Sequence, residues 1–159
     1  MDKLDDIDVQ ILDRLQRDGR VKRTDLAAEV GLSIPSVSDR MRKLEARGVL
    51  TGFHATVDAK RLGRDVMAYV FVQSTGSEHY PEFVATVTAL DEVQELHSVT
   101  GDGSHVLKVR VANTTALERL LARLQAVPGV RGTRTSLVLS THKETAYVPS
   151  EPMTLPPTD

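Results

Sequence analysis

The sequence contains no cysteine and no tryptophan, and only 4% of its 159 residues are aromatic. The lack of cysteine excludes disulfide bonds and thiolate metal sites. No apolar run approaches the roughly 20 residues of a membrane span. The acidic N-terminus, MDKLDDIDVQ, has no uninterrupted apolar stretch and is therefore not a secretory signal. We expect a cytoplasmic protein.

Signatures of catalysis and of cofactor binding are also missing. The sequence has no phosphate-binding loop, no GxSxG elbow and no Rossmann fingerprint. None of the five histidines is followed by another three or four residues later, so no helical metal site is visible. We expect no catalytic residue, no metal and no cofactor, and hence a protein that is not an enzyme.

A net positive charge, the usual mark of a nucleic-acid-binding protein, is lacking as well, because the formal net charge is −2. Residues 1–63 hold 12 Lys and Arg against 11 Asp and Glu, whereas residues 64–159 hold 8 against 11. This difference between the halves is small. Any case for DNA binding therefore depends on where the basic side chains lie rather than on their number.

The first part of the chain has the spacing of helices. Apolar residues recur at helical intervals over residues 5–18, 24–30 and 34–47. Before the third helix, Ser33 is a suitable N-cap, and Pro35 falls in the first turn, where its missing N–H costs nothing. The side chains expected to face inward from this helix are Ile34, Val37, Met41 and Leu44. The second and third helices, joined at Gly31-Leu32-Ser33, make a helix-turn-helix candidate.

From Val49 the period changes to two, which predicts a strand over residues 49–58 and then a polar connection. The rest follows the order β-α-β-β-α-β, with strands at 66–74, 93–100, 105–112 and 130–141 and helices at 80–90 and 115–126. This is the ferredoxin-like pattern, so the expected fold class is α+β.

Four segments follow from these patterns. They are a helix-turn-helix domain (1–50), a linking strand and hinge (51–64), a ferredoxin-like domain (65–146), and a Pro-rich tail (147–159). The tail has the composition of a flexible segment. We expect it to be ordered only where a partner, such as a neighbouring subunit, holds it.

In a helix-turn-helix the second helix enters the major groove of DNA. Away from its apolar stripe, the third helix here carries small polar and basic side chains. The candidate DNA-binding residues are Ser33, Pro35, Ser36, Ser38, Asp39, Arg40, Arg42, Lys43 and Arg47. Ser and Arg near the helix start suit base edges, and basic groups further along suit phosphates. By charge and periodicity alone, a three-helix bundle with a solvated charged face is an equally good interpretation.

Two separate blocks of sequence match a known family. The first half contains Leu26-Ala27…Val30-Gly31-Leu32-Ser33 and Arg40…Arg42…Leu44-Glu45…Gly48-Val49, and the second contains VTGDGSHVLKVRV (99–111) and PGVRGTRTSLVLS (128–140). In these motifs and their order the chain closely resembles the Lrp/AsnC regulators of bacteria and archaea, the leucine-responsive, asparagine-responsive or feast/famine proteins. The resemblance covers about residues 4–145.

The resemblance implies a sequence-specific transcription regulator that binds double-stranded DNA through a winged helix-turn-helix. A small molecule, usually an amino acid, modulates such regulators from clefts between their C-terminal domains. The linking strand, here Val49–Val57, is expected to pair with the same strand of a second chain. Homodimers of the family assemble further into octamers or tetramers.

The loop Thr100-Gly101-Asp102-Gly103-Ser104 joins two expected strands. Its spacing favours a plain hairpin turn, whereas the resemblance implies an effector cradle. The effector-binding residues that it implies are Thr100, Gly101, Asp102, Gly103, Ser104, His105, Thr133, Thr135 and Ser136. Many relatives carry Tyr-Asp-Tyr or Phe-Asp-Tyr where this chain has Gly103-Ser104-His105. The smaller first residue opens space and His105 adds a titratable group, so we expect an effector bulkier or more polar than leucine.

Two other functions stay open. Proteins that resemble this family include haem-pathway decarboxylases, which act on modified tetrapyrroles with His and Arg side chains in the C-terminal cleft. The chain is alternatively a ligand-binding or oligomerising module that does not bind DNA. The basic flank of the third helix argues against both. A coloured purified protein would favour the first alternative, and a gel shift with the gene's own upstream region decides the second.

Overall fold

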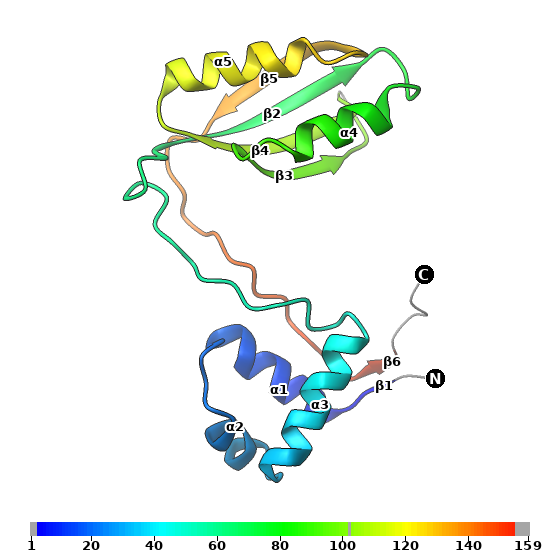
Figure 1. The fold of residues 1–159 in the computed structure, drawn as a ribbon, viewed down its shortest axis with the longest axis vertical. Coiled ribbons are helices and arrows are strands. Elements are labelled where there is room, and N and C mark those ends of the chain that lie inside the picture. Colours follow the sequence, from blue (N-terminus) through cyan, green and yellow to red (C-terminus); the bar gives the residue numbers. More distant parts are fainter. Residues whose placement is uncertain (1–2, 102, 155–159) are drawn as a thin grey trace. The chain divides into compact units, whose positions relative to one another are not determined.

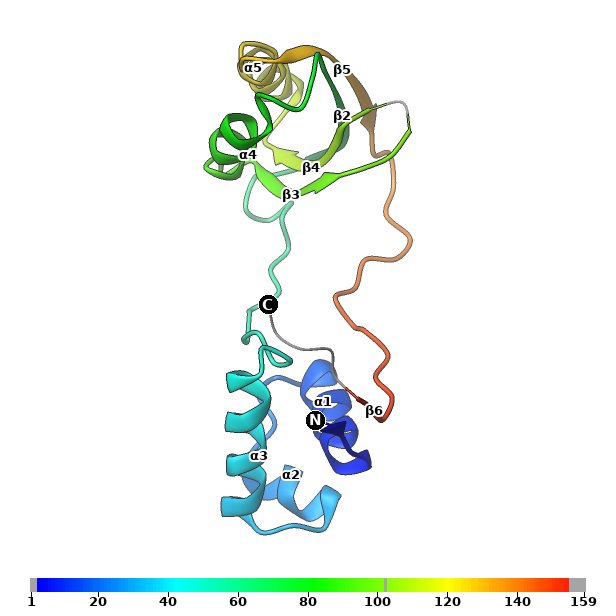
Figure 2. The same cartoon turned by 90° about the vertical axis from the view of Figure 1, so that its right-hand side faces the viewer.

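The computed structural model describes residues 3–101 and 103–154. These residues form two compact units (Figures 1 and 2). The first consists of the described residues up to Thr56 and those from Glu144 onward, and the second spans Val57–Lys143. The chain therefore passes from one unit to the other twice.

Three helices build the first unit: α1 (Asp6–Arg17), α2 (Arg23–Val30) and α3 (Ile34–Ala46). Asp5 caps α1 by accepting a bond from the Asp8 N–H, and Ser33 caps α3 by accepting one from the Ser36 N–H. Between α2 and α3, Gly31 has a φ of 68°, the left-handed conformation that ends a helix at little cost in glycine. The helix-turn-helix predicted from sequence is confirmed.

The core of the first unit is a single apolar cluster between the three helices. It consists of Leu4, Ile11, Leu12, Leu15, Leu26, Ala27, Val37, Met41 and Leu44. Three members of the predicted stripe of α3 are in it. The fourth, Ile34, is 44% exposed, so its assignment to the buried stripe was wrong. Ile34 occupies the first position of the helix.

The C-terminal tail belongs to the first unit. Strand β6 (Met153–Thr154) pairs antiparallel with β1 (Lys3–Leu4), and Val148 exchanges hydrogen bonds with the side chain of Gln16 in α1. The tail is thus held by the N-terminal part of its own chain. The sequence predicted flexibility or a hold from a neighbouring subunit, because composition reveals nothing of such long-range pairing.

The second unit has the predicted β-α-β-β-α-β order: β2 (Val66–Ser74), α4 (Tyr80–Thr88), β3 (Val93–Ser98), β4 (His105–Val111), α5 (Thr114–Gln125) and β5 (Val130–Leu137). Its strands form one antiparallel sheet in the order β3-β4-β2-β5. Both helices lie on the same face of this sheet (Figure 2). The α+β, ferredoxin-like class is confirmed.

The core of this unit lies between the sheet and its helices. Alternate residues Ala68, Val70 and Val72 of β2 point into it, where they meet Phe83 of α4 and Leu120 of α5. Val84, next to Phe83 in α4, is 39% exposed. None of the helices that the structure describes in this unit covers the other face of the sheet.

The expected linking strand is not a strand in this chain. Residues 51–57 pair with no strand among the described residues and are exposed, including Phe53 and Val57. The prediction of a strand over 49–58 is wrong for the chain by itself. A period-2 pattern marks a chain suited to strand pairing, and the strand forms only where a second strand supplies the hydrogen bonds.

Candidate nucleic-acid interface and effector pocket

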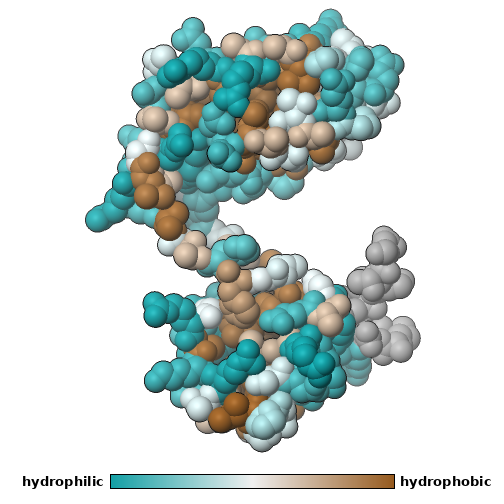
Figure 3. All heavy atoms as spheres, viewed as in Figure 1, coloured by the Kyte–Doolittle hydropathy of each residue, from teal (hydrophilic) through white to brown (hydrophobic). Residues whose placement is uncertain are grey.

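Helix α3 carries its polar residues on the side away from the core. Its apolar side is buried at Val37, Met41 and Leu44. Of the predicted DNA-binding residues, Ser33, Pro35 and Ser36 are exposed at the helix start, and Ser38 is half-buried. The side chains of Arg42 and Lys43 are 75% and 64% exposed. Mainly hydrophilic side chains cover this part of the unit, which faces the viewer in Figures 1 and 3.

Asp39 serves as an internal counter-charge for the exposed cations. Its carboxylate lies 2.8 Å from the Lys43 ammonium and also accepts a bond from the Arg42 guanidinium. Lys43 first, then Arg42, lower the pKa of the Asp39 carboxyl, which therefore stays ionised. Such exposed pairs are weak and exchangeable. Phosphate oxygens can take the place of Asp39, which leaves these two cations available to a polyanion.

Arg40 differs from its neighbours because it binds acidic residues at the start of α1. One guanidinium nitrogen donates to Asp8 at 2.7 Å and to Asp5 at 2.8 Å. Asp8 is only 5% exposed. The bond to Asp8 is the main cause of the raised pKa of Arg40. Burial alone would raise the pKa of Asp5, but the Asp8 N–H and Arg40 together hold it below its ordinary value.

The ion pairs of Arg40 therefore tie α3 to α1 and fix the orientation of the polar side of α3. The sequence predicted Arg40 only as a DNA contact. The positioning role was missed because periodicity does not show that Asp5 and Asp8 lie opposite Arg40.

A shallow concavity of about 280 Å³ runs along this side of α3. Its lining is Asp8, Ser36, Asp39, Arg40, Lys43 and Arg47. The structure thus brings together five of the predicted DNA-binding residues: Ser36, Asp39, Arg40, Lys43 and Arg47. Arg20, Lys22 and Arg23, just before and at the start of α2, are exposed and add positive charge to the same unit.

The second candidate site is an open pocket of about 520 Å³ in the second unit. It is lined by Gln73, Ser74, Tyr80, Val99, Thr100, Gly101, Gly103, Ser104 and Arg131. Four of these belong to the predicted effector loop. Asp102, the fifth loop residue, lies outside the described residues.

Short contacts fix the loop against β2. The Ser104 N–H donates to the Val72 carbonyl at 2.9 Å, and the Ser104 hydroxyl donates to the Ser74 hydroxyl at 2.7 Å. A Cβ at Gly103 would lie 3.1 Å from the same Val72 carbonyl oxygen. Gly101 has a φ of 109°, which other residues rarely adopt. Both glycines are thus required by the path of the loop.

His105 does not line this pocket. Its side chain is fully buried under α4, with its ring centroid 4.7 Å from that of Tyr80 and 4.8 Å from that of Phe83. Neither ring nitrogen has a hydrogen-bond partner among the residues that the structure describes. Burial lowers the pKa of the imidazole, so the ring is neutral. The expectation that His105 adds a polar group to the pocket is corrected accordingly.

The three predicted residues of β5 also lie away from the pocket lining. Thr133 accepts a bond from the Gln125 amide of α5 at 2.8 Å, which places it on the helix-covered side of the sheet. Thr135 shares that side, because it pairs with the inward-facing Val70, whereas Ser136 pairs with the outward-facing Tyr69. Residues adjacent in a strand point to opposite faces, so these three do not form one surface.

Five pocket residues were missed by sequence reasoning. Val99 directly precedes the effector loop, and the other four are Gln73, Ser74, Tyr80 and Arg131. These four come from the end of β2, the start of α4 and the start of β5, which meet beside the loop. The available signal was the sheet order. In a ferredoxin-like sheet the first strand lies between the third and the fourth, so the end of β2 adjoins the loop that leads into β4.

Among residues 3–101 and 103–154 the structure shows no helix that is long and apolar enough to span a membrane. The same residues contain no cluster of three or more His, Asp or Glu side chains that is suited to a metal ion.

Two family models match the chain. The model described as Lrp/AsnC ligand binding domain matches residues 66–148, and the one described as winged helix-turn-helix DNA-binding matches residues 4–51. Similar curated proteins include the HTH-type transcriptional regulator FL11 of Pyrococcus horikoshii, 35% identical over 92% of this chain and 96% of that protein. The leucine-responsive regulatory protein of Salmonella typhimurium is 39% identical over 89% of this chain and 88% of its own length.

Solved structures agree with these matches. The feast or famine regulatory protein of Mycobacterium tuberculosis, complexed with L-methionine, has a TM-score of 0.86 and 35% identity, covering 92% of this chain and 99% of that one. The L-methionine complex of a transcriptional regulator from Neisseria meningitidis has a TM-score of 0.86 and 26% identity, covering 92% of this chain and 96% of that one.

Proposed function

Because the chain belongs to the Lrp/AsnC family of transcription regulators, we propose that α3 reads double-stranded DNA in the major groove. The observation that supports this most is the exposure of Arg42 and Lys43 on a helix whose other side is buried. Arg40 holds α3 against α1, so the side chains that would contact DNA project from a helix of fixed orientation. Ser33, Pro35, Ser36 and Ser38, near the helix start, suit base edges, and Arg42, Lys43 and Arg47 suit phosphates.

The DNA-binding form is a homodimer that assembles further into an octamer or tetramer. Two features support self-association: the sheet face without helices in the second unit, and the exposed segment 51–57. On that sheet face Tyr69 is 39% exposed, and the Arg134 guanidinium lies 4.8 Å from the Phe71 ring centroid. A dimer reads two half-sites about one helical turn apart, so its operator is a pseudo-palindrome.

The pocket beside the effector loop takes an amino acid. Its lining is mainly polar, with Val99 as its one aliphatic side chain among the described residues. This composition favours an effector more polar than leucine, since an aliphatic ligand gains affinity by burying apolar surface. L-methionine is the first probe, because two similar regulators were solved with it. We assign the protein no catalytic activity and place it in the cytoplasm, where its DNA partner lies.

Selection of bound duplexes from a random pool, with and without each amino acid, tests the function as a whole. We expect a pseudo-palindromic consensus, a dimer or larger assembly on it, and affinity that falls steeply with salt as counterions are released. At least one amino acid should change the affinity or the assembly. Failure to enrich any sequence would refute the DNA-binding function, and tight binding of leucine alone would refute the polar pocket.

A further inference from the structure

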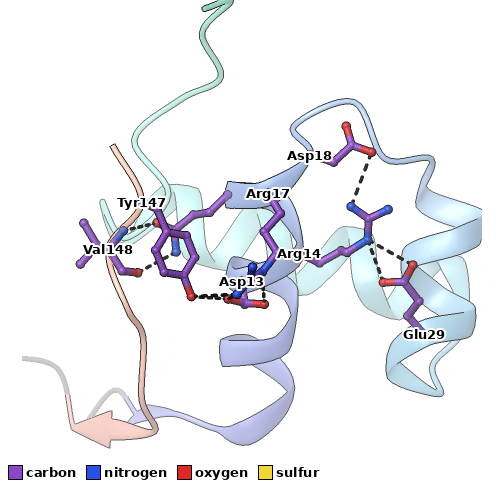
Figure 4. A network of polar contacts seen from close by, with 8 residues as sticks. Asp13, Arg14, Arg17, Asp18, Glu29, Tyr147 and Val148 are labelled. Atoms are coloured by element: carbon purple, nitrogen blue, oxygen red, sulfur yellow. Dashed lines mark hydrogen bonds and ion pairs between the residues drawn. The ribbon is translucent and has the colours of Figure 1, made fainter. Parts of the chain in front are cut away.

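A small set of polar contacts fastens the C-terminal tail to α1, and we call it the tail clasp: Asp13, Gln16 and Arg17 of α1 with Tyr147 and Val148 of the tail (Figure 4). The Gln16 amide donates to the Val148 carbonyl at 2.9 Å and accepts from the Val148 N–H at 2.7 Å. This is the pairing that a neighbouring strand would offer. The clasp therefore recognises an extended backbone together with a tyrosine.

Tyr147 makes the second half of the tail clasp. Its hydroxyl donates to the Asp13 carboxylate, and the Arg17 guanidinium lies 5.1 Å from the ring centroid. The bond to Asp13 is the main cause of the raised pKa of Tyr147. All these groups lie at the surface, where water competes for each hydrogen bond and its net contribution is small. The clasp is thus specific enough to choose this segment and weak enough to open.

The tail is also continuous with the strand that borders the effector pocket. Arg131, near the start of β5, lines the pocket. The carbonyl of Gly129, the residue directly before β5, accepts a hydrogen bond from the Thr75 N–H at 2.9 Å. At the other end the Val138 N–H still bonds to the Met67 carbonyl, and then residues 139–146 lead to Tyr147 without regular structure. One strand thus has the pocket at its start and the tail clasp after its end.

We propose that the tail clasp is a docking site on α1 for the chain's own residues 147–148, and that it gives β5 a second mechanical link to the DNA-binding unit. The first link is the segment that follows α3. Two links restrict where a DNA-binding unit can go more than one link does. In a dimer on DNA this restriction raises the effective concentration of the second unit at its half-site. The inference rests on the proposed dimeric reading of two half-sites.

The existence of the clasp is tested first, without DNA or effector. We compare hydrogen exchange of the full-length protein with Gln16→Ala and Tyr147→Phe. Gln10→Ala is the matched control, since Gln10 is exposed on the same helix and lies outside the tail clasp. The two clasp variants should exchange amides 145–150 at least several-fold faster than the control. Equal exchange in Gln16→Ala and Gln10→Ala would overturn the clasp.

The identity of the occupant is tested by cross-linking. The chain has no cysteine, so Lys3→Cys with Thr154→Cys supplies the only two thiols for a short bis-maleimide. These positions pair in β1 and β6 and leave the residues of the tail clasp intact. A bridged product of single-chain mass on a denaturing gel is expected. A product of twice that mass means that a second copy's tail occupies the site and overturns docking in cis.

The mechanical link is tested by an insertion that leaves the clasp residues intact. Six Gly and Ser residues between Ser140 and Thr141 lengthen the tail next to Leu139, which is 92% exposed. We expect affinity for the full pseudo-palindromic site to fall about 3- to 10-fold, and affinity for an isolated half-site to stay unchanged. Equal loss on both sites, or no loss on either, overturns the link. Failure of the parent protein to bind any selected duplex would instead refute the proposed function.

Discussion

Among the described residues, each unit of the molecule buries one polar side chain, and the surroundings of the two side chains differ. In the first unit Asp8 is 5% exposed and bonds to Arg40 at 2.7 Å. In the second unit His105 is fully buried, and neither ring nitrogen has a hydrogen-bond partner within residues 3–101 and 103–154. Asp8 is thus held in an ion pair with Arg40, whereas burial lowers the pKa of His105 and keeps it neutral.

This difference between Asp8 and His105 indicates how each buried polar group affects its own unit. A buried ion pair specifies geometry, because only one placement of α3 satisfies both partners, although the pair adds little net stability. An unpaired neutral imidazole does not fix the placement of a helix in this way. It makes the unit sensitive to acid, because a positive charge on the buried ring would lack the stabilising contact with water. The first unit is therefore built for a fixed orientation, and the second carries a latent dependence on pH.

The largest effect is expected from Arg40→Ala, which leaves the Asp8 carboxylate buried without a counter-charge. Breaking a fully buried pair costs about 3–5 kcal/mol. Because the Arg40 side chain is 29% exposed, we expect about 2 kcal/mol here. Native-state hydrogen exchange of α1 and α3 measures the loss. Arg42→Ala, on the exposed side of the same helix, is the control and should leave exchange unchanged, whereas adding Asp8→Asn to Arg40→Ala should restore part of the stability.

The second largest effect on stability is expected from His105→Leu, which replaces the unpaired ring by an apolar side chain. We expect the second unit to gain about 1 kcal/mol, because a buried unsatisfied polar group is removed. The folded-state pKa of His105 lies below the unfolded value of about 6.5. On acidification the unfolded chain therefore takes up the proton first. The parent protein should lose stability as the pH falls below about 6.5.

Thermal unfolding of the second unit at pH 7.5 and at pH 5.5 checks this. The drop in melting temperature between the two pH values should be smaller in His105→Leu than in the parent. His97→Leu, at an exposed position of β3, is the matched control and should keep the parent's drop. An identical drop in all three proteins would show that His105 is not the group responsible.

A smaller effect is expected at the start of α3. Ser33→Ala removes the side chain that accepts the Ser36 N–H, and the loss of such a cap costs about 1 kcal/mol or less. If the fixed orientation of α3 depends mainly on Arg40, this variant should lower the melting temperature only slightly, and less than Arg40→Ala does. Ser38→Ala, inside the helix, is the control and should not destabilise. A loss of stability in Ser33→Ala as large as that in Arg40→Ala would contradict the assignment of orientation to Arg40.

The smallest effect on stability, and a clear one on DNA binding, is expected for Lys43→Ala. The Lys43 ammonium is exposed and pairs only with Asp39 among the described residues. The melting temperature should stay at the parent's value, while affinity falls on all sequences and the slope of log affinity against log salt decreases by about 1. Glu45→Ala, at an exposed position nearby, should not weaken binding. Unfolding of Lys43→Ala would show that this side chain is structural.

Much of the fold was predictable because it is encoded locally. Helical spacing and a good cap at Ser33 predicted α1 to α3, and the change of period predicted the strands of the second unit. Local patterns do not determine pairing between distant segments. The antiparallel contact of β6 with β1 and the absence of a strand over 51–57 are both matters of which partner is present.

The candidate sites show the same division. The flank of α3 was predictable, because a helix of known phase places its residues on known sides. The pocket was predictable only at its loop, since the other walls come from β2, α4 and β5. His105 was misplaced because a residue at the start of a strand faces either side, and the hydrogen-bonded register of β4 with β2 decides which. Thr135 and Ser136 share no face, which their adjacency in a strand already implied.

The double passage of the chain between its units has a practical consequence for protein engineering. The DNA-binding unit is assembled from both ends of the polypeptide, with β1 beside β6. A fragment cut after α3 is therefore not a complete cassette for transplantation, and an affinity tag on the C-terminus extends from the DNA-binding unit rather than from the sensor. Circular permutation that joins the two ends would turn the same unit into one contiguous gene segment.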